Sequence, residues 1–472
     1  MKRNVVLICL DTVRKDYFDR FAPRLSAAAN VSYEQCRTAS AWSTPSHASM
    51  LTGTLPHEHG VHTHNRDFST LAREDTVIGD LTREGYAALG VSANLFVGPR
   101  YGFDTLFDRF TPVTPDVVFQ DAWEPLDVEG TGVRRGLNYV RAARDRNQLG
   151  KYTANVAAHR VNQILKRLPV SFQDKGGAAV SREALGQIRE TEGPFVQFVN
   201  FMDAHQPHHP FRGIDDSLHA VPRGWTSADD FYRVKWDINR EGRVEENREF
   251  LDRFEQLYGA SVEYLDRLVV DFIDQVRAET DGNTTFVVTA DHGENLGGAA
   301  DGYLFEHTSS LSEGLLHVPC VVVDAPTDDE RVVTETVSHL QLRELLVGLA
   351  RGELPDISRD RIAAEVVGLS PGTVDLTADE EAYFDRMLRA VYEGDRKYVW
   401  DSQGNALAYR LDCERPSWQE LTEEDVRPPE WASAFFPGDI TTAKERARDG
   451  ASEGRETVDS FAEARLRDLG YL

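Results

Sequence analysis

The segment from Ser43 to Gly53, S-T-P-S-H-A-S-M-L-T-G, places a pair of hydroxyl side chains directly before a proline. Because the fixed φ of proline suits the first turn of a helix, the segment predicts a helix running to Leu51 with Ser43 and Thr44 at its N-terminus. Free backbone N–H groups and the positive end of the helix dipole favour an oxyanion there, such as a phosphoryl or sulfuryl group. The alternative is that Ser43 or Thr44 only caps the helix.

Polar residues follow three apolar runs that are typical of strands buried on both faces of a parallel sheet. Asp11 follows Val5–Leu10, Asp203 and His205 follow Pro194–Met202, Asp291 and His292 follow Thr284–Thr289, and His307 comes on a later loop. Parallel strands bring their carboxyl ends to one edge of a sheet, so we expect these side chains to converge there with the Ser43 turn.

Carboxylates and imidazoles gathered at one edge suit a divalent cation, and a hydroxyl beside such a cation is easier to deprotonate. Each residue taken singly could have a purely structural role instead. Asp291-His292-Gly293 could be a helix cap, and His205 could simply hold its loop by hydrogen bonds. It is much less probable that the three strand ends and the Ser43 turn all carry such residues by chance.

The composition is that of a large globular protein with an acidic surface. The 472 residues are 41% hydrophobic and 10% aromatic, which allows a large core and roughly two to four domains. The net charge is -26, and only eight of the 52 basic residues are lysine. This balance resembles proteins of salt-loving microbes. It argues against a nucleic acid partner, because no excess of basic residues displaces counterions.

The cysteines and the N-terminus indicate a cytoplasmic protein. Cys9, Cys36, Cys320 and Cys413 are far apart and form no C-x-x-C pair, which favours a reducing compartment. The apolar run Val5–Leu10 is too short for an export signal, and no segment reaches the length of a transmembrane helix.

A basic segment interrupts the acidic chain within a predicted helical insertion at about residues 111–190. Between Arg134 and Arg167 there are nine basic residues and one acid, with apolar residues at helical spacing. The segment is either a solvated helix face, a cap over an anionic substrate, or a peripheral contact with anionic lipid headgroups.

The remaining patterns predict further elements. Helices are expected at Pro23–Ala29, Thr76–Glu84, Phe250–Val276 and Val458–Leu469, and strands at Ala87–Leu95 and Val318–Val323. Short strands at Ala382–Tyr392, Lys397–Trp400 and Leu407–Leu411, separated by turns, suggest a small antiparallel sheet. The tract containing His57, His59, His62 and His64 is interpreted as a loop with solvated histidines, with metal binding as the alternative.

Taken in order, these motifs resemble the sulfatase branch of the alkaline phosphatase superfamily. The matching motifs are N-V-V-L-I-C-L-D at Asn4–Asp11, S-T-P-S-H-A-S-M-L-T-G at Ser43–Gly53, H-E-H-G-V at His57–Val61, G-F-D at Gly102–Asp104, F-M-D-A-H-Q-P at Phe201–Pro207, T-A-D-H-G-E at Thr289–Glu294, H-V-P at His317–Pro319, Y-R-L-D at Tyr409–Asp412 and the C-terminal L-G-Y-L. The resemblance runs nearly end to end.

The resemblance implies an α/β fold with a large mixed, mainly parallel sheet flanked by helices, and a small C-terminal antiparallel sheet subdomain. The catalytic domain would cover residues 1–355 and the C-terminal α+β subdomain residues 356–472. The resemblance also implies one divalent cation, Ca, Mg or Mn, bound by Asp11, Asp291 and His292 and completed by Ser43. A formylglycine made from Ser43 is part of the same implication.

The chain departs from the usual sulfatase pattern in its cationic residues. His47 stands where C-x-P-S-R or S-x-P-S-R has arginine, and Thr12 follows Asp11 where many members have a second aspartate. The sulfate-clamping G-K-W-H has no counterpart, since S-A-N-L-F occupies Ser92–Phe96, and Thr308 replaces a lysine after His307. With His47, the segment S-T-P-S-H is intermediate between the sulfatase pattern and T-x-P-N-H, the pattern of related phosphodiesterases whose nucleophile is an unmodified hydroxyl.

These features predict a metal-dependent hydrolase of small anionic esters, sulfatase-like, with Ser43 as nucleophile or formylglycine precursor. His47 would orient or polarise the nucleophile, and His205 or His307 would protonate the leaving oxygen. The alternatives are a phosphoesterase, or a transferase acting on a cell-envelope glycan or lipid headgroup with unmodified Ser43. A non-catalytic binding protein on the same fold is a third hypothesis.

Overall fold

The computed structural model describes residues 2–115, 174–307, 310–368 and 376–449, together with single positions between 117 and 157. The predicted helix Val458–Leu469 lies outside the described residues. So does most of the basic segment Arg134–Arg167, of which Arg141, Arg144 and Lys151 are the described basic residues.

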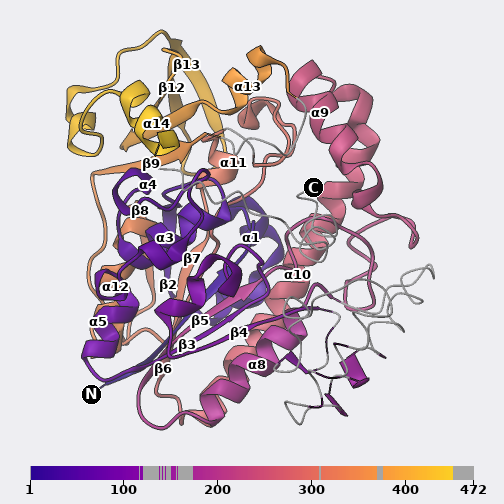
Figure 1. The fold of residues 1–472 in the computed structure, drawn as a ribbon, viewed down its shortest axis with the longest axis vertical. Helices are drawn as coiled ribbons and strands as arrows, with labels where there is room; N and C mark the ends of the chain where they lie inside the picture. Colours follow the sequence, from indigo (N-terminus) through magenta and orange to yellow (C-terminus); the bar gives the residue numbers. More distant parts are fainter. Residues whose placement is uncertain are drawn as a thin grey trace.

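An eight-stranded sheet in the order β4-β3-β5-β1-β6-β7-β2-β8 forms the centre of the protein (Figure 1). Its strands are β1 (Asn4–Leu10), β2 (Ala29–Arg37), β3 (Ala87–Ser92), β4 (Arg109–Pro112), β5 (Phe195–Phe201), β6 (Thr284–Thr289), β7 (Cys320–Val323) and β8 (Arg331–Ser338). Within this described sheet β7 alone runs against its neighbours, so the predicted mixed, mainly parallel sheet is confirmed.

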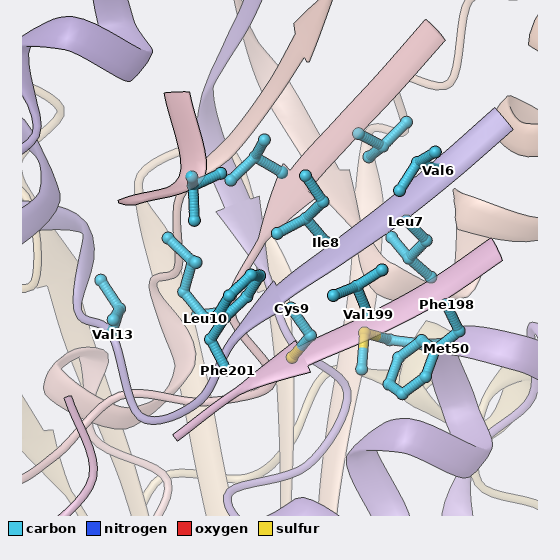
Figure 2. Close-up of a cluster of buried hydrophobic side chains, with 14 of the residues drawn as sticks. Val6, Leu7, Ile8, Cys9, Leu10, Val13, Met50, Phe198, Val199 and Phe201 are labelled. Atoms are coloured by element: carbon cyan, nitrogen blue, oxygen red, sulfur yellow. The ribbon is translucent and has the colours of Figure 1, made fainter. Parts of the chain in front are cut away.

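The central strand β1 is buried along its whole length, as its apolar run predicts. Alternate side chains point to opposite faces of the sheet, with Ile8 and Leu10 on one side and Cys9 on the other (Figure 2). Leu10 is level with Phe201 of β5, and Cys9 with Thr289 of β6. This register makes the three strands end at the same edge.

Helices cover both faces of the large sheet. On one face, α10 (Arg248–Glu279) packs against α1 (Lys15–Phe21), α2 (Pro23–Ala28) and α8 (Gly177–Arg189), and on the other α12 (Leu342–Arg351) packs against α3 (Ser43–Thr52) and α5 (Val77–Arg83) (Figure 1). Shorter helices are α4 (Pro56–His59), α9 (Phe231–Glu241) and α11 (Glu313–Leu316). The predicted long helix is confirmed as α10, whose apolar stripe is buried.

The small C-terminal antiparallel sheet is also confirmed, with one correction. Its order is β13-β12-β11-β10-β9, with strands β9 (Arg361–Val367), β10 (Met387–Glu393), β11 (Arg396–Asp401), β12 (Ala406–Leu411) and β13 (Gln419–Glu424), and with helices α13 (Ala378–Phe384) and α14 (Ile440–Asp449). The predicted strand Ala382–Tyr392 was wrong at its start, which lies in α13. Thr377 and Glu380 form a capping box there, and this local hydrogen bonding favours a helix.

A buried carboxylate at the start of α11 joins the two sheets. Glu313 accepts hydrogen bonds from Arg37 Nε of β2 at 3.0 Å, from Lys397 Nζ of β11 at 2.9 Å and from Tyr392 OH of β10 at 2.8 Å. Burial by itself raises the pKa of Glu313, but Lys397 and Arg37 outweigh burial and hold this pKa well below its usual range. Glu313 is therefore ionised in the folded protein.

Replacing this carboxylate should destabilise the protein in a pH-dependent way. We expect Glu313→Ala to lower the free energy of unfolding by about 3–5 kcal/mol at pH 7, because two cations lose a buried partner. Because the pKa of Glu313 is lower in the folded than in the unfolded protein, its carboxylate stabilises the fold fully above the unfolded pKa of 4.5. This stabilisation is lost as the pH falls through the folded pKa. The free energy of unfolding in urea should therefore differ most between wild type and Glu313→Ala at pH 7, and this difference should shrink only below pH 4.5.

Glu393, which pairs with Arg361 at the surface of the same small sheet, provides the matched control. Glu393→Ala should change the free energy of unfolding by less than about 1 kcal/mol, because exposed ion pairs are screened. A Glu313→Ala effect as small as this would contradict the assigned role of Glu313.

Candidate active site

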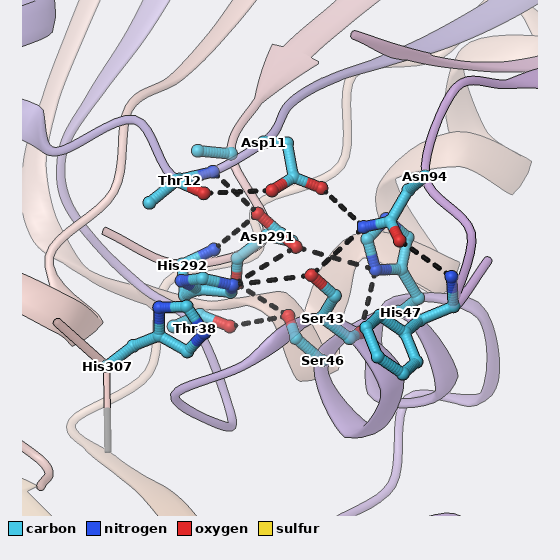
Figure 3. Close-up of polar contacts among 12 residues, drawn as sticks. Asp11, Thr12, Thr38, Ser43, Ser46, His47, Asn94, Asp291, His292 and His307 are labelled. Carbon is cyan, nitrogen blue, oxygen red and sulfur yellow. Dashed lines mark hydrogen bonds and ion pairs between the residues drawn. The ribbon is translucent and has the colours of Figure 1, made fainter. Parts of the chain in front are cut away.

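The predicted helix after the hydroxyl pair is confirmed as α3, and Ser43 is its first residue. The N-cap position is held by Trp42, in extended conformation and without a capping side-chain bond, so Ser43 is not the cap. Its Oγ lies 3.1 Å from Asn94 Nδ2 and 3.4 Å from His292 Nε2 (Figure 3). In the same turn, Ser46 Oγ donates to the Asp291 carbonyl at 2.6 Å, which fixes the start of α3 against the end of β6.

Asp11, Asp291 and His292 meet beside Ser43, as the strand ends predict (Figure 3). Each offers one ligand atom, all within 4.8 Å of one another, and all three residues are buried. We call these three residues the metal group. In the described part of the chain it is the single cluster of this kind.

Hydrogen bonds orient the metal group toward a common point. His292 Nδ1 donates to the Gly293 carbonyl at 2.8 Å, which leaves the Nε2 lone pair facing Ser43 Oγ and Asp291 Oδ2. Asp291 Oδ1 accepts from the backbone N–H of Thr12 and of His292. Asp291 Oδ2 is buried and has no hydrogen-bond partner among the described residues.

The electrostatics of the metal group fit a bound cation. Burial, and then the nearby Asp291, raise the pKa of Asp11 well above its usual value. Burial lowers the pKa of His292 to about 4, so its imidazole is neutral and able to ligate. Two buried carboxylates, one of them with an unpartnered oxygen, and a neutral imidazole form a donor set that suits Ca, Mg or Mn.

Two asparagines complete the hydrogen bonding, and neither was among the predicted site residues. Asn94 Nδ2 lies 2.7 Å from Asp11 Oδ2 and 3.1 Å from Ser43 Oγ, and its Oδ1 accepts from Phe96 N. Asn200 of β5 donates to His47 Nε2 at 3.1 Å. Asn94 follows the end of β3, so the same strand-end argument could have found it.

His47 contacts the backbone of the nucleophile, not its hydroxyl. Its Nδ1 donates to the Ser43 carbonyl at 2.7 Å, while its Nε2 accepts from Asn200. Burial lowers the pKa of His47, which keeps the imidazole neutral. This geometry makes His47 a positioning residue that holds the first turn of α3 against β5.

His307 and His205 lie close to His292 of the metal group. The ring centroid of His307 lies 4.8 Å from that of His292 and 6.0 Å from that of His205. Burial alone lowers the pKa of His307, but Glu306 and Glu294 outweigh burial and raise this pKa to about 9. Burial lowers the pKa of His205 to about 3. At neutral pH the His307 imidazole is therefore protonated, whereas the His205 imidazole is neutral.

Asp203, the remaining predicted strand-end residue, stays outside the metal group. Its Oδ1 accepts from the backbone N–H of Lys175 at 2.9 Å, which ties the loop after β5 to the start of α8. Lys175 Nζ in turn donates to the His205 carbonyl. Lys175 is a half-buried amine near this site, and desolvation lowers its pKa to about 7. It was not among the predicted site residues, because no recognisable motif surrounds it.

The histidine tract after α3 is structural, and the expectation of solvated side chains was wrong. His57 Nδ1 lies 2.9 Å from Glu365 Oε2, and His64 Nε2 lies 3.3 Å from Asp385 Oδ1. Glu365 belongs to β9 and Asp385 precedes β10, so the small sheet covers the tract. None of these histidines joins a metal group among the described residues.

Asn94→Ala should slow, but not abolish, the hydrolysis of anionic esters that the sequence predicts. Its amide bonds both Asp11 and Ser43 Oγ, so we expect kcat to fall about tenfold to a hundredfold, the effect of losing a hydrogen bond to a charged group. Asn4→Ala is the control, because Asn4 is buried at the opposite end of β1, where it bonds Thr284 Oγ1 and Phe195 N, and its loss should leave kcat near that of wild type. An Asn94→Ala variant with wild-type kcat would contradict the positioning role.

The site therefore combines a hydroxyl at the start of a helix with a buried carboxylate–imidazole group at the carboxyl edge of a mainly parallel sheet. The chain belongs to the sulfatase family, whose model matches residues 3–352. It is 23% identical over 355 residues to the uncharacterized sulfatase YidJ of Escherichia coli (strain K12), a match that covers 70% of this chain. The chain spans 63% of the length of that curated relative.

Solved structures share the fold. The phosphonate monoester hydrolase of Agrobacterium radiobacter is 17% identical with a TM-score of 0.56, over 87% of this chain and 89% of that one. A 2-O GAG sulfatase is 15% identical with a TM-score of 0.53, over 99% of this chain and 91% of that one. Sulfatases generally use a divalent metal, which agrees with the donor set found here. Among the described helices, none has the length and apolarity needed to cross a membrane.

Proposed function

We propose that this protein is a metal-dependent hydrolase of sulfate or phosphate esters in which Ser43, unmodified or converted to formylglycine, is the nucleophile. The observation that carries the proposal is the placement of Ser43 Oγ, 3.4 Å from His292 Nε2 and bonded to the same amide as Asp11. A hydroxyl used only to hold the fold would not need to adjoin a buried cation site.

The residues have separable roles in this reaction. The bound cation would act as a Lewis acid toward the transferring group and ease the loss of the Ser43 proton. In the unmodified form, Ser43 Oγ gives its proton to solvent and forms a bond to sulfur or phosphorus, while the bond from that atom to the ester oxygen breaks. His307, which is protonated at neutral pH, gives a proton to the departing ester oxygen, whereas the neutral His205 would first have to gain one. Water then attacks the same sulfur or phosphorus atom, the bond to Ser43 Oγ breaks, this oxygen takes a proton back, and sulfate or phosphate leaves. Asn94 and His47 hold the nucleophile in place for attack.

An unmodified serine acting on phosphate esters is the second form of this proposal. The position of His47 supports it, because an imidazole bonded to the Ser43 carbonyl leaves no arginine beside the transferring group. The transferase and non-catalytic alternatives would give, respectively, group transfer to an added alcohol and no turnover despite bound metal.

The general acid can be identified with esters of different leaving groups. We expect His307→Gln to slow esters with poor, alkyl-type leaving groups about a hundredfold to ten-thousandfold, and to affect nitrophenyl esters much less, because a good leaving group needs no proton. His205→Gln should show the same pattern if His205 is the acid. Equal losses on both ester types for both variants would contradict a general acid role.

Further parts of the proposal rest on sequence. We place the catalytic domain in residues 1–355, with an insertion at about 111–190, and the subdomain in residues 356–472. Substrates linked to a carbohydrate are suggested by the similarity to a GAG sulfatase, and lipid-linked ones by the basic segment Arg134–Arg167. We also propose that the protein is cytoplasmic and adapted to salt, as the cysteine spacing and the acidic composition suggest.

If the basic segment Arg134–Arg167 binds anionic vesicles electrostatically, this binding should weaken as the salt concentration rises.

A further inference from the structure

Arg66 stacks on two aromatic rings that lie next to the nucleophile in the chain. Its guanidinium carbon lies 5.3 Å from the ring centroid of Trp42 and 5.4 Å from that of Phe96. Trp42 directly precedes Ser43, and Phe96 donates its backbone N–H to Asn94, whose amide bonds Ser43 Oγ. The two rings meet edge to face, with their centroids 6.1 Å apart. A cation is therefore fixed close to the site by both segments.

The charge of Arg66 is not neutralised by a carboxylate of the described residues. It forms no hydrogen bond or ion pair with any of them, whereas Arg14, Arg37 and Arg389 are each paired with an acid. The adjacent Asp67 carboxylate instead accepts from Ser69 N. A cation–π contact holds a guanidinium in place and leaves its charge available to a ligand. Arg66 and Trp42 are both partly exposed, so a ligand can reach them.

Among the described residues, the Ser43 hydroxyl contacts the Asn94 amide and the His292 imidazole, and neither an arginine nor a lysine. The segment Ser92–Phe96 offers Asn94 in place of a clamping cation. In a chain with a net charge of -26, a further positive charge near the site favours the binding of an anionic substrate, in addition to the cation site itself. Arg66 supplies such a charge beside a flat aromatic surface.

We propose that Arg66 is a specificity-determining residue that binds a second anionic group of the substrate, while Trp42 packs against the ring that carries this group. The preferred substrates are then esters of an anionic ring, a sugar or aromatic ring bearing a carboxylate, sulfate or phosphate. This inference rests on the proposed function of Ser43, because the ester group must sit at that hydroxyl for Arg66 to reach the rest of the substrate.

The test compares nitrophenyl sulfate and phosphate with the same esters carrying a carboxylate on the ring. Wild-type protein should prefer the carboxylated esters. In Arg66→Gln the ratio of the two kcat/KM values should fall about tenfold to a hundredfold through KM, the effect of losing a charge-assisted hydrogen bond. Arg66→Lys, which keeps the charge, should retain part of the preference. A ratio unchanged in Arg66→Gln would overturn the proposal.

Arg415 provides a matched control, because it stacks on Trp418 with its guanidinium carbon 4.3 Å from the ring centroid. Arg415 lies in the segment between β12 and β13, and we expect Arg415→Gln to leave the ratio as in wild type. If Arg415→Gln lowers the ratio as much as Arg66→Gln does, the effect is one of general surface charge and the inference fails.

A binding measurement separates this inference from the proposed function. Calorimetric titration of the Ser43→Ala protein with carboxyphenyl phosphate should show affinity that falls with added salt and is at least tenfold weaker when Arg66→Gln is also present. Arg66-dependent binding to Ser43→Ala, together with no ester turnover by the wild-type protein, would support this inference and refute the proposed reaction. Ester turnover by the wild-type protein, together with binding to Ser43→Ala that is independent of Arg66, would do the reverse.

Discussion

Ser43→Ala is expected to lower kcat about ten-thousandfold or more, with the fold and the other three metal-site residues, Asp11, Asp291 and His292, intact. The reason is that the hydroxyl forms the new bond to sulfur or phosphorus, so its loss removes the reaction path and not merely one contact. Turnover of nitrophenyl sulfate and phosphate in the presence of Ca, Mg or Mn measures the effect. Full activity in Ser43→Ala would exclude Ser43 as the nucleophile.

Ser49 offers a matched control within the same helix. It is buried like Ser43, and its Oγ bonds His59 Nε2 at 3.1 Å, away from the metal group. We expect Ser49→Ala to cost about 1 kcal/mol of stability, the net value of one hydrogen bond, and to keep kcat within about threefold of wild type. An equal loss of kcat in both variants would indicate damage to α3 as a whole.

Mass spectrometry of the peptide that contains Ser43 then separates the two forms of the proposed reaction. An aldehyde after co-expression with a maturation system favours a sulfatase. An intact serine that becomes phosphorylated during turnover favours a phosphoesterase.

Asp291→Asn is the second large expected effect. Removing this carboxylate should abolish stoichiometric metal binding and turnover, because Asp291 is one of two acidic ligands and its Oδ2 has no other hydrogen-bond partner among the described residues. Saturating the wild-type protein at a hundred times the Kd should stabilise it by about 2.7 kcal/mol. In Asp291→Asn we expect no such stabilisation. Elemental analysis and thermal unfolding with and without added metal measure both effects.

Asp266 is the control for the loss of a buried carboxylate. It lies in α10, where it accepts the backbone N–H groups of Arg24 and Leu25 at the start of α2. Asp266→Asn should lower the melting temperature but preserve the stabilisation by metal. Metal-induced stabilisation that survives in Asp291→Asn would exclude Asp291 as a ligand.

The sequence alone was sufficient for the elements that position the site. The apolar run before Asp11 predicts a strand buried on both faces, and β1 is one. Pro45 after the hydroxyl pair predicts a helix start, and α3 begins at Ser43. Both signals are local, because the period of apolar residues and the backbone limits of proline act within a few residues. The domain boundaries remain predictions.

The partners of each polar side chain were decided by the tertiary structure. His47 could be expected near the nucleophile, but only the packing of α3 on β5 turns its ring toward Asn200 and the Ser43 carbonyl. The histidine tract looked solvated because the strand β9 that covers it lies about 300 residues further along the chain.

The segment from Ser43 to Gly53 shows this division most clearly. Its own residues determined a helix with a hydroxyl at the start. Its neighbours Asn94, Asp11 and His292 come from the ends of β3, β1 and β6, and the register across the sheet brings them to that hydroxyl. Local patterns encode the period and burial of a segment, whereas a reactive site depends on contacts between segments that are distant in sequence, and those contacts exist only in the folded chain.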